Sequence, residues 1–249
     1  MNLTAVQTTM AHPLRSAQVA KKVQFTRLLE QLRITWIWQW VLENNPGGRN
    51  PYHSNAHMQY VALSAAQLYM MENIPRGGYE ETGLAEIVVA ALLHDYGHTA
   101  GEADDEKNIE IAIETGIGEM YESLENQFGK GFTDRVIQHI RCTQYPFVYT
   151  PQNMEQACLR DADAMQSFEP DGVSIIMEGL RTEMQVSMGK QIGRREMAEG
   201  QLKFLDGIEF FTDTAKQLHE ALLPSLKEAF LAYAETVEPK PVGDNFDVV

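Results

Sequence analysis

The stretch AALLHDYGHTAG, residues 90–101, decides how the rest of this chain is interpreted. An apolar run with helical character begins near Leu84 and ends abruptly at His94 and Asp95, with His98 four positions after the first histidine. An imidazole beside a carboxylate at the end of a buried helix costs several kcal/mol unless a cation uses both groups. The stretch therefore predicts a core helix that ends in a ligand site, and other parts of the chain should supply further donors.

The composition is that of a globular protein with a small-molecule ligand. The 249 residues are 44% hydrophobic and 22% charged, which is enough for one large domain or two small ones. The chain has 35 acidic and 20 basic residues, and its net charge of −15 disfavours binding to nucleic acid or to an anionic membrane. We therefore expect a small-molecule partner, no nucleic acid and no membrane, and we leave the oligomeric state open.

The number of cysteines and the first residues of the chain indicate the cellular compartment of the protein. Cys142 and Cys158 are the only cysteines and form no CxxC motif, which fits a reducing compartment better than a disulfide framework. The first residues lack a basic segment followed by a long apolar core, and no run approaches the roughly 18 apolar residues of a membrane span. We therefore expect a cytoplasmic protein.

Apolar spacing predicts helices along most of the chain. Apolar residues recur at steps of three and four over residues 16–42, which predicts one long amphipathic helix. A short helix over residues 104–114 follows the core helix, and Asp105 is able to cap it. Further helices are expected at residues 52–71, 86–96, 119–127, 132–142, 152–166, 172–185, 196–217 and 220–235.

The expected fold is all-α, because β-branched residues never alternate with polar ones over a useful length. We find no internal repeat and no linker long enough to divide the chain. The sequence therefore predicts a single helical domain over residues 17–237, preceded by a loose arm (1–16) and followed by a disordered tail (238–249).

Two further segments supply donors that suit a metal ion. His53 and His57 are four residues apart and so lie on one face of a helix. His57, the pair His94 and Asp95, and an aspartate near position 160 would bring imidazole and carboxylate groups together from three helices. This mixture suits zinc, manganese, iron or magnesium, and the carboxylates favour the harder ions.

Two aspartates compete for the last ligand position. Asp161 and Asp163 are two residues apart on a predicted helix, so their side chains point in different directions. We assign Asp163 to the metal and place Asp161 behind the ligands or at the surface.

These motifs resemble a known family. The order of His57, His94-Asp95 and Asp163 resembles the H…HD…D pattern of the HD-domain phosphohydrolases, an all-helical superfamily of metal-dependent phosphoesterases. Within it the chain is similar to the catalytic domain of the class I cyclic nucleotide phosphodiesterases. Residues 50–57 (NPYHSNAH) resemble the NPYHNxxH segment of that family, residues 94–101 resemble HDxxHxG, and residues 200–208 (GQLKFLDGI) are similar to SQVGFIDYI.

The resemblance implies two divalent cations. His57, His94, Asp95 and Asp163 would hold the tighter ion, expected to be zinc, and Asp95 would bridge to magnesium or manganese. Hydroxide generated between the two ions would attack phosphorus.

The resemblance also implies supporting roles for two histidines and a carboxylate. His53 would protonate the departing O3′, and His98 would fix water on the second ion. Residues 105–110 resemble the DESVLE run of these enzymes, which nominates Glu110 as a carboxylate near the site. Glu125 is a rival that the sequence does not exclude.

Substrate-side residues follow from the same comparison. Gln201 could offer its amide to a purine edge while Phe204, one turn further on, stacks on the base. Gln166 occupies the place where many relatives have a base-tuning asparagine or aspartate. Thr143 matches the threonine of the TDM motif in the relatives, and Tyr52 precedes the donor histidine. All five are assigned to substrate binding.

The sequence therefore predicts hydrolysis of 3′,5′-cyclic purine nucleotides (cAMP or cGMP) to 5′-monophosphates. A nucleotidase or dNTP hydrolase could use the same metals. The short segment between His98 and Asp163 could also admit cyclic dinucleotides. A nucleotide-binding HD module without activity is the non-enzymatic alternative. A di-iron oxygenase is disfavoured because only His139 remains to supply the additional ligands it needs.

Overall fold

The structure is a computed structural model that describes residues 19–236, and every regular element in this range is helical. This confirms the predicted all-α class. The arm and tail expected at residues 1–16 and 238–249 lie outside the described residues. No helix among the described residues is both long and apolar enough to cross a membrane.

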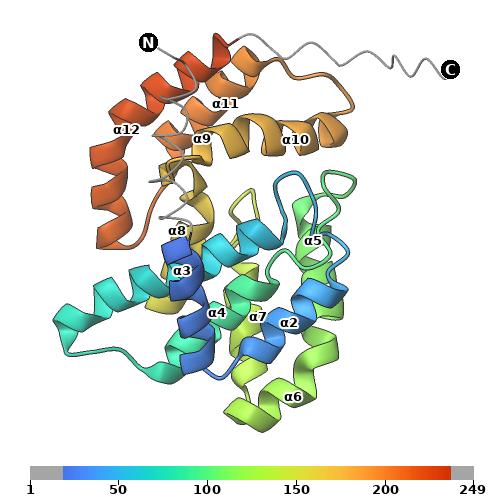
Figure 1. The fold of residues 1–249 in the computed structure, drawn as a ribbon, viewed down its shortest axis with the longest axis vertical. Coiled ribbons are helices and arrows are strands. Elements are labelled where there is room, and N and C mark those ends of the chain that lie inside the picture. Colours follow the sequence, from blue (N-terminus) through green and yellow to red (C-terminus); the bar gives the residue numbers. More distant parts are fainter. Residues whose placement is uncertain (1–18, 237–249) are drawn as a thin grey trace, which may run out of the picture.

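The helices form two groups, which Figure 1 shows at opposite ends of the molecule. We call residues 19–164 the bundle and residues 172–236 the cap. The bundle contains a helix over residues 19–31, then α2 (Thr35–Asn44), α3 (Asn55–Asn73), α4 (Glu81–Leu93), α5 (Asp105–Ile111), α6 (Gly118–Phe128), α7 (Phe132–Arg141) and α8 (Met154–Ala164). The cap contains α9 (Gly172–Ile175), α10 (Arg181–Met188), α11 (Arg194–Gly207) and α12 (Asp213–Ala234). Short 3₁₀ turns occur at η1 (Ile74–Arg76) and η3 (Gln166–Phe168), and π-helical turns occur at η2 (Ala112–Ile117) and η4 (Ile176–Leu180).

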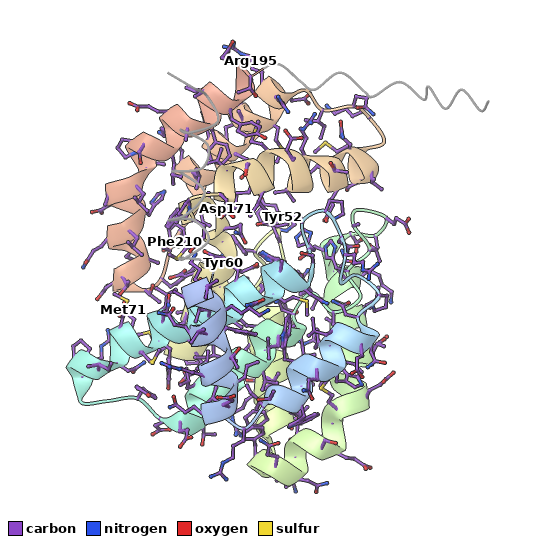
Figure 2. The ribbon with its side chains drawn as sticks, viewed as in Figure 1. Tyr52, Tyr60, Met71, Asp171, Arg195 and Phe210 are labelled. Atoms are coloured by element: carbon purple, nitrogen blue, oxygen red, sulfur yellow. The ribbon has the colours of Figure 1, made fainter. Side chains whose placement is uncertain are left out.

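The central element of the bundle is α4, the core helix expected from the sequence. All its residues from Gly83 to Leu93 are buried, because α4 packs against α2, α3, α7 and α8. It ends at Leu93, so His94 and Asp95 lie in the turn that follows, still inside the core. The cap has a second hydrophobic cluster of its own, which includes Tyr52 from the segment before α3. Figure 2 shows Tyr52 between the two groups of helices.

Several predicted helix boundaries were wrong. The helix expected over residues 16–42 is broken at residues 32–34, where Arg33 has φ 58°, a value that a right-handed helix cannot continue. The apolar spacing runs across the break because Leu32, Ile34 and Ile37 all face the same core. Asp104, not Asp105, caps α5 by accepting a hydrogen bond from the Lys107 amide.

The cap also departs from the predicted boundaries. The break expected at residues 218–219 lies at residues 208–212 instead, and Pro224 falls inside α12, which bends along its length (Figure 1). The helix expected over residues 172–185 is interrupted by η4, whose Gly179 lies so close to the bundle that a Cβ there would be 2.3 Å from the Pro51 carbonyl oxygen. The cap and the bundle therefore meet by direct backbone contact.

Candidate metal centre

Three side chains form a buried donor cluster at the end of α4. His57 Nε2 lies 3.6 Å from Asp95 Oδ2, and His94 Nε2 lies 3.1 Å from the same oxygen. One donor atom from each residue fits within a 4.8 Å group. The arrangement arises because α3 presents His57 to the turn that terminates α4.

Asp163 joins this cluster from the last turn of α8. Its Oδ1 lies 3.0 Å from His57 Nε2 and 3.5 Å from His94 Nε2. Burial alone would raise the pKa of Asp163, but the neighbouring rings of His57 and His94 outweigh burial and hold the pKa below its usual range. The structure thus brings together all four residues expected to bind the tighter ion.

The hydrogen bonding of His94 provides a test of whether a cation fits. His94 Nδ1 donates to the Ala91 carbonyl oxygen at 2.8 Å, so Nε2 is the nitrogen left for another partner. His94 Nε2 and Asp95 Oδ2 are both buried without a hydrogen-bond partner. Burial would raise the pKa of Asp95, but His94 and His53 lower it strongly, so the carboxylate is ionised. A cation satisfies both orphaned atoms, and the donor set therefore fits a divalent metal ion.

A second donor group shares Asp95 with the first. His53, Asp95 and His98 also offer one donor atom each within 4.8 Å of one another. The rings of His53 and His98 stack with their centroids 3.8 Å apart. Burial and the neighbouring His53 lower the pKa of His98 to about 4, which keeps His98 neutral at physiological pH. Asp95 is thus placed between two groups of imidazoles.

The carboxylate that accompanies His53 is Glu183 on α10, which the sequence reasoning missed. Glu183 Oε2 lies 2.5 Å from His53 Nδ1, and Oε1 accepts hydrogen bonds from the backbone amides of Tyr52 (2.7 Å) and His53 (3.1 Å). Burial would lower the pKa of His53, but Asp95 and Glu183 together raise it. No spacing rule could have found Glu183, because 130 residues separate it from His53.

The two carboxylates proposed from the sequence have other contacts. Glu110 is exposed on α5 and pairs with Lys107 (2.9 Å). Glu125 accepts hydrogen bonds from the amides of Gly131 and Thr133, so it caps the start of α7. Neither contacts His53 in the structure, and Glu183 occupies that place.

Two other predicted residues have unexpected surroundings. Asp161 is buried, and its oxygens accept hydrogen bonds from the amides of Phe211 and Thr212 and from the Thr212 hydroxyl, so it fastens α8 to the start of α12. Gln166, expected on the substrate side, is buried, and its Oε1 lies 3.2 Å from His57 Nδ1. Its position three residues after Asp163 was the only sequence signal that it lies near the metal ligands.

A cavity of about 640 Å³ opens beside the donor cluster, between the bundle and the cap. Its wall includes Asp163 and His53 on the bundle side and Gln201 and Phe204 from α11 on the cap side. Tyr52 and Thr143 also line it, as expected for substrate-side residues. The remaining apolar wall comes mostly from the cap, through Ile176, Leu180, Met184, Met188, Ile192 and Met197.

The charged residues of the cavity are mostly acidic. Away from the donor cluster, the described residues of the cavity wall include three acidic residues, Asp105, Glu196 and Glu199, and one basic residue, Lys203. Asp105 Oδ2 accepts a hydrogen bond from the Tyr145 amide at 2.6 Å, and burial raises the pKa of Asp105 to about 6. The described residues of the cavity wall therefore offer little positive charge to an anion near Asp163.

Comparison with known proteins places the fold. No family model matches the chain, and no curated protein does. Among solved structures, the chain is similar to the phosphodiesterase domain of the RhoPDE fusion protein from the choanoflagellate Salpingoeca rosetta, with 14% sequence identity and a TM-score of 0.57. The match covers 90% of each chain. The chain therefore has a helical fold like that of a phosphodiesterase domain.

Proposed function

We propose that this protein is a metal-dependent phosphodiesterase that hydrolyses 3′,5′-cyclic purine nucleotides to 5′-monophosphates. One observation carries the proposal: Asp163 and His53, at the donor cluster, line the same cavity as Gln201 and Phe204 of α11. A phosphate beside the donor cluster and a base beside α11 would thus share one cavity.

We infer that the donor cluster holds two divalent cations, zinc with magnesium or manganese. His57, His94, Asp95 and Asp163 would hold one ion, and Asp95, which belongs to both donor groups, would also help to hold the other. When bound, such ions neutralise charge on the phosphate and lower the pKa of a coordinated water to near neutrality. Outside the donor cluster Lys203 is the one basic residue among the described residues of the cavity wall, so the protein itself offers the phosphate little other positive charge.

The pair His53 and Glu183 supports general acid catalysis. Glu183 engages Nδ1 of His53, which leaves Nε2 as the nitrogen that can give a proton. In the proposed reaction a water gives up one proton to solvent and adds to phosphorus as hydroxide, the bond from phosphorus to O3′ breaks, and the His53 proton passes to O3′. Solvent then returns a proton to His53, so the net reaction consumes one water. His98, which is neutral, stacks on the face of the His53 ring and helps to hold it in place.

The opposite end of the cavity supports binding of a base. Phe204 offers a ring for stacking, and Tyr145 meets that ring edge-on with centroids 6.0 Å apart. Gln201 carries one donor and one acceptor group on its amide, which suits the edge of a purine.

The acidic wall favours a substrate with one phosphate over a nucleoside triphosphate. Asp105, Glu196 and Glu199 would repel additional phosphates, which proteins generally bind through arginine and lysine. The same repulsion disfavours the second phosphate of a cyclic dinucleotide. The orphaned donors and the His53–Glu183 pair favour an enzyme over a module that only binds nucleotides.

The experiment is a substrate panel with the purified full chain. The protein is incubated with Mn²⁺, or with Zn²⁺ plus Mg²⁺, and with cAMP, cGMP, cCMP, cyclic dinucleotides and dNTPs, and the products are resolved by chromatography. We expect turnover of the cyclic purine mononucleotides to 5′-monophosphates. Turnover of dNTPs alone, or of no compound while the metals are bound, would contradict the proposal.

A further inference from the structure

Gln166 has a position that base recognition does not explain. It begins η3, directly beyond α8, and only 5% of its surface is exposed. It is not among the residues that line the cavity, whereas its neighbour Ser167 is. Its side-chain oxygen Oε1 instead lies 3.2 Å from Nδ1 of His57. A buried amide is thus committed to one of the metal-binding histidines.

This contact determines which nitrogen of His57 carries a proton. An amide oxygen can only accept a hydrogen bond, so Nδ1 of His57 is the donor. Nε2 is then the nitrogen presented to the donor cluster, 3.0 Å from Asp163 Oδ1 and 3.6 Å from Asp95 Oδ2. A histidine that binds a metal through one nitrogen is held in the correct tautomer by the hydrogen bond of the other.

The chain places both contacts of His57 on one short segment. Asp163, at the end of α8, and Gln166, at the start of η3, are three residues apart, and they reach opposite nitrogens of the same ring. His57 comes from α3, which packs against α8. The imidazole is therefore held at both nitrogens by one short segment, and its orientation depends on where α8 ends and η3 begins.

The choice of an amide has a physical reason. Metal-binding histidines often donate to a carboxylate, which makes the imidazole more basic. Here buried Asp95 and partly exposed Asp163 already put two negative charges beside His57. A third carboxylate, buried at position 166, would add repulsion and desolvation, and glutamine provides the acceptor without the charge.

We propose that Gln166 is a positioning residue that fixes the Nδ1–H tautomer of His57, and so sets metal affinity, and that it does not read the base. The inference rests on the metal-binding part of the proposed function alone. It stands if the protein binds a divalent cation but turns over none of the cyclic nucleotides.

The test is the affinity of the full chain for Zn²⁺, measured by competition with a fluorescent chelator. Gln166→Leu removes the acceptor and should weaken Zn²⁺ binding about 10- to 100-fold. Gln166→Glu keeps an acceptor of the same length and should bind Zn²⁺ at least as tightly as the wild type. Equal affinity in Gln166→Leu and the wild type would overturn the proposal.

Gln156 provides a matched control on α8, the helix just before Gln166. It is also buried, and its Oε1 accepts one hydrogen bond, from the Gln152 amide. Gln156→Leu therefore loses a comparable bond away from the donor cluster and should keep wild-type Zn²⁺ affinity. Equal losses in the two leucine variants would mean that Gln166 acts only through general stability, which also overturns the proposal.

A spectroscopic measurement separates positioning from packing. In the Zn²⁺-loaded protein with ¹⁵N-labelled histidine, the Nδ1–H proton of His57 should be protected from exchange, and Gln166→Leu should abolish that protection. If Gln166→Leu does not fold, Gln166→Met, which also lacks the amide acceptor, replaces it and should show the same loss of Zn²⁺ affinity and of exchange protection. Wild-type affinity and protection in that variant would contradict the proposed role.

Discussion

The bundle and the cap contribute to the candidate site with different chemistry. The bundle supplies the donor cluster, with orphaned polar atoms buried at the end of its central helix. The cap supplies one buried carboxylate, Glu183, and most of the apolar wall of the cavity. Under the proposed function, the bundle would bind the cations, and the cap would orient the proton donor and enclose the substrate.

The two aspartates of α8 offer the strongest test of this division. Asp163→Ala removes a donor from the cluster, so we expect loss of bound metal and a fall in activity of about 10³-fold or more. Asp161→Ala leaves the buried amides of Phe211 and Thr212 unpaired, which should cost about 1–3 kcal/mol of stability while metal content is retained. Elemental analysis and thermal melts distinguish the two. Metal loss in Asp161→Ala would show that the hydrogen bonds between α8 and the start of α12 also position the donor cluster, which would contradict the division.

A second test addresses the carboxylate of the cap. Glu183→Gln keeps an oxygen for the amides of Tyr52 and His53 but removes the charge beside Nδ1 of His53. We expect kcat to fall about 10²-fold with metal content unchanged, because general acid catalysis contributes roughly this factor or more. Glu110→Gln, at an exposed position, is the control and should behave as the wild type. An unchanged kcat in Glu183→Gln would mean that Glu183 of the cap does not assist His53 as a general acid.

The contact between the bundle and the cap can be perturbed at Gly101, where the loop after α4 meets α10; we call this contact the seam. This residue has φ +95°, and a Cβ there would lie 2.3 Å from the backbone oxygen of Glu183. Gly101→Ala should push α10 away from the bundle, lowering both the melting temperature and kcat. Gly189→Ala is matched, because Gly189 also has positive φ (+61°) but nothing lies near its Cβ position. That control should cost about 1–2 kcal/mol and leave kcat intact. Equal kcat values in the two variants would mean that the seam does not position Glu183.

The smallest expected effect concerns pH and Asp105. Burial raises the pKa of this carboxyl from its ordinary 3.8 to about 6, so the folded protein binds more protons than the unfolded chain between these values. Stability contributed at this site therefore falls as pH rises from about 4 to 6. Asp105→Asn should match the wild type at pH 4 and exceed it by about 1 kcal/mol above pH 7, or roughly 2–4 °C in melting temperature. A difference that stays constant across this pH range would contradict the assignment.

Much of the metal cluster could be predicted because its signal is local. His94 and Asp95 are adjacent at the end of an apolar run, and His57 belongs to a short motif. The all-α class followed from the same apolar spacing. Spacing reports which side chains face the core, however, and not whether the backbone continues, so the break at Arg33 was missed.

Residues that meet through tertiary contact were harder to predict. Glu183 reaches His53 across 130 residues, and no periodic pattern carries that information. Glu110 was nominated on motif similarity, but five residues along a helix turn its side chain about 140° from that of Asp105, which lines the cavity. Gln166 could have faced either the cavity or His57 from the same position. Only the packing of α8 against α3 decides between them.

The π-helical turn η4, just before α10, makes the position of α10 depend on the number of residues in this segment as well as on their identity. Such a turn accommodates one extra residue, and each residue added to or removed from a helix rotates everything after it by about 100°. A one-residue deletion within residues 176–180 would turn Glu183 away from His53 while leaving every metal donor in place. Among related proteins with this fold, we therefore expect insertions and deletions in this segment to abolish activity more often than point substitutions do.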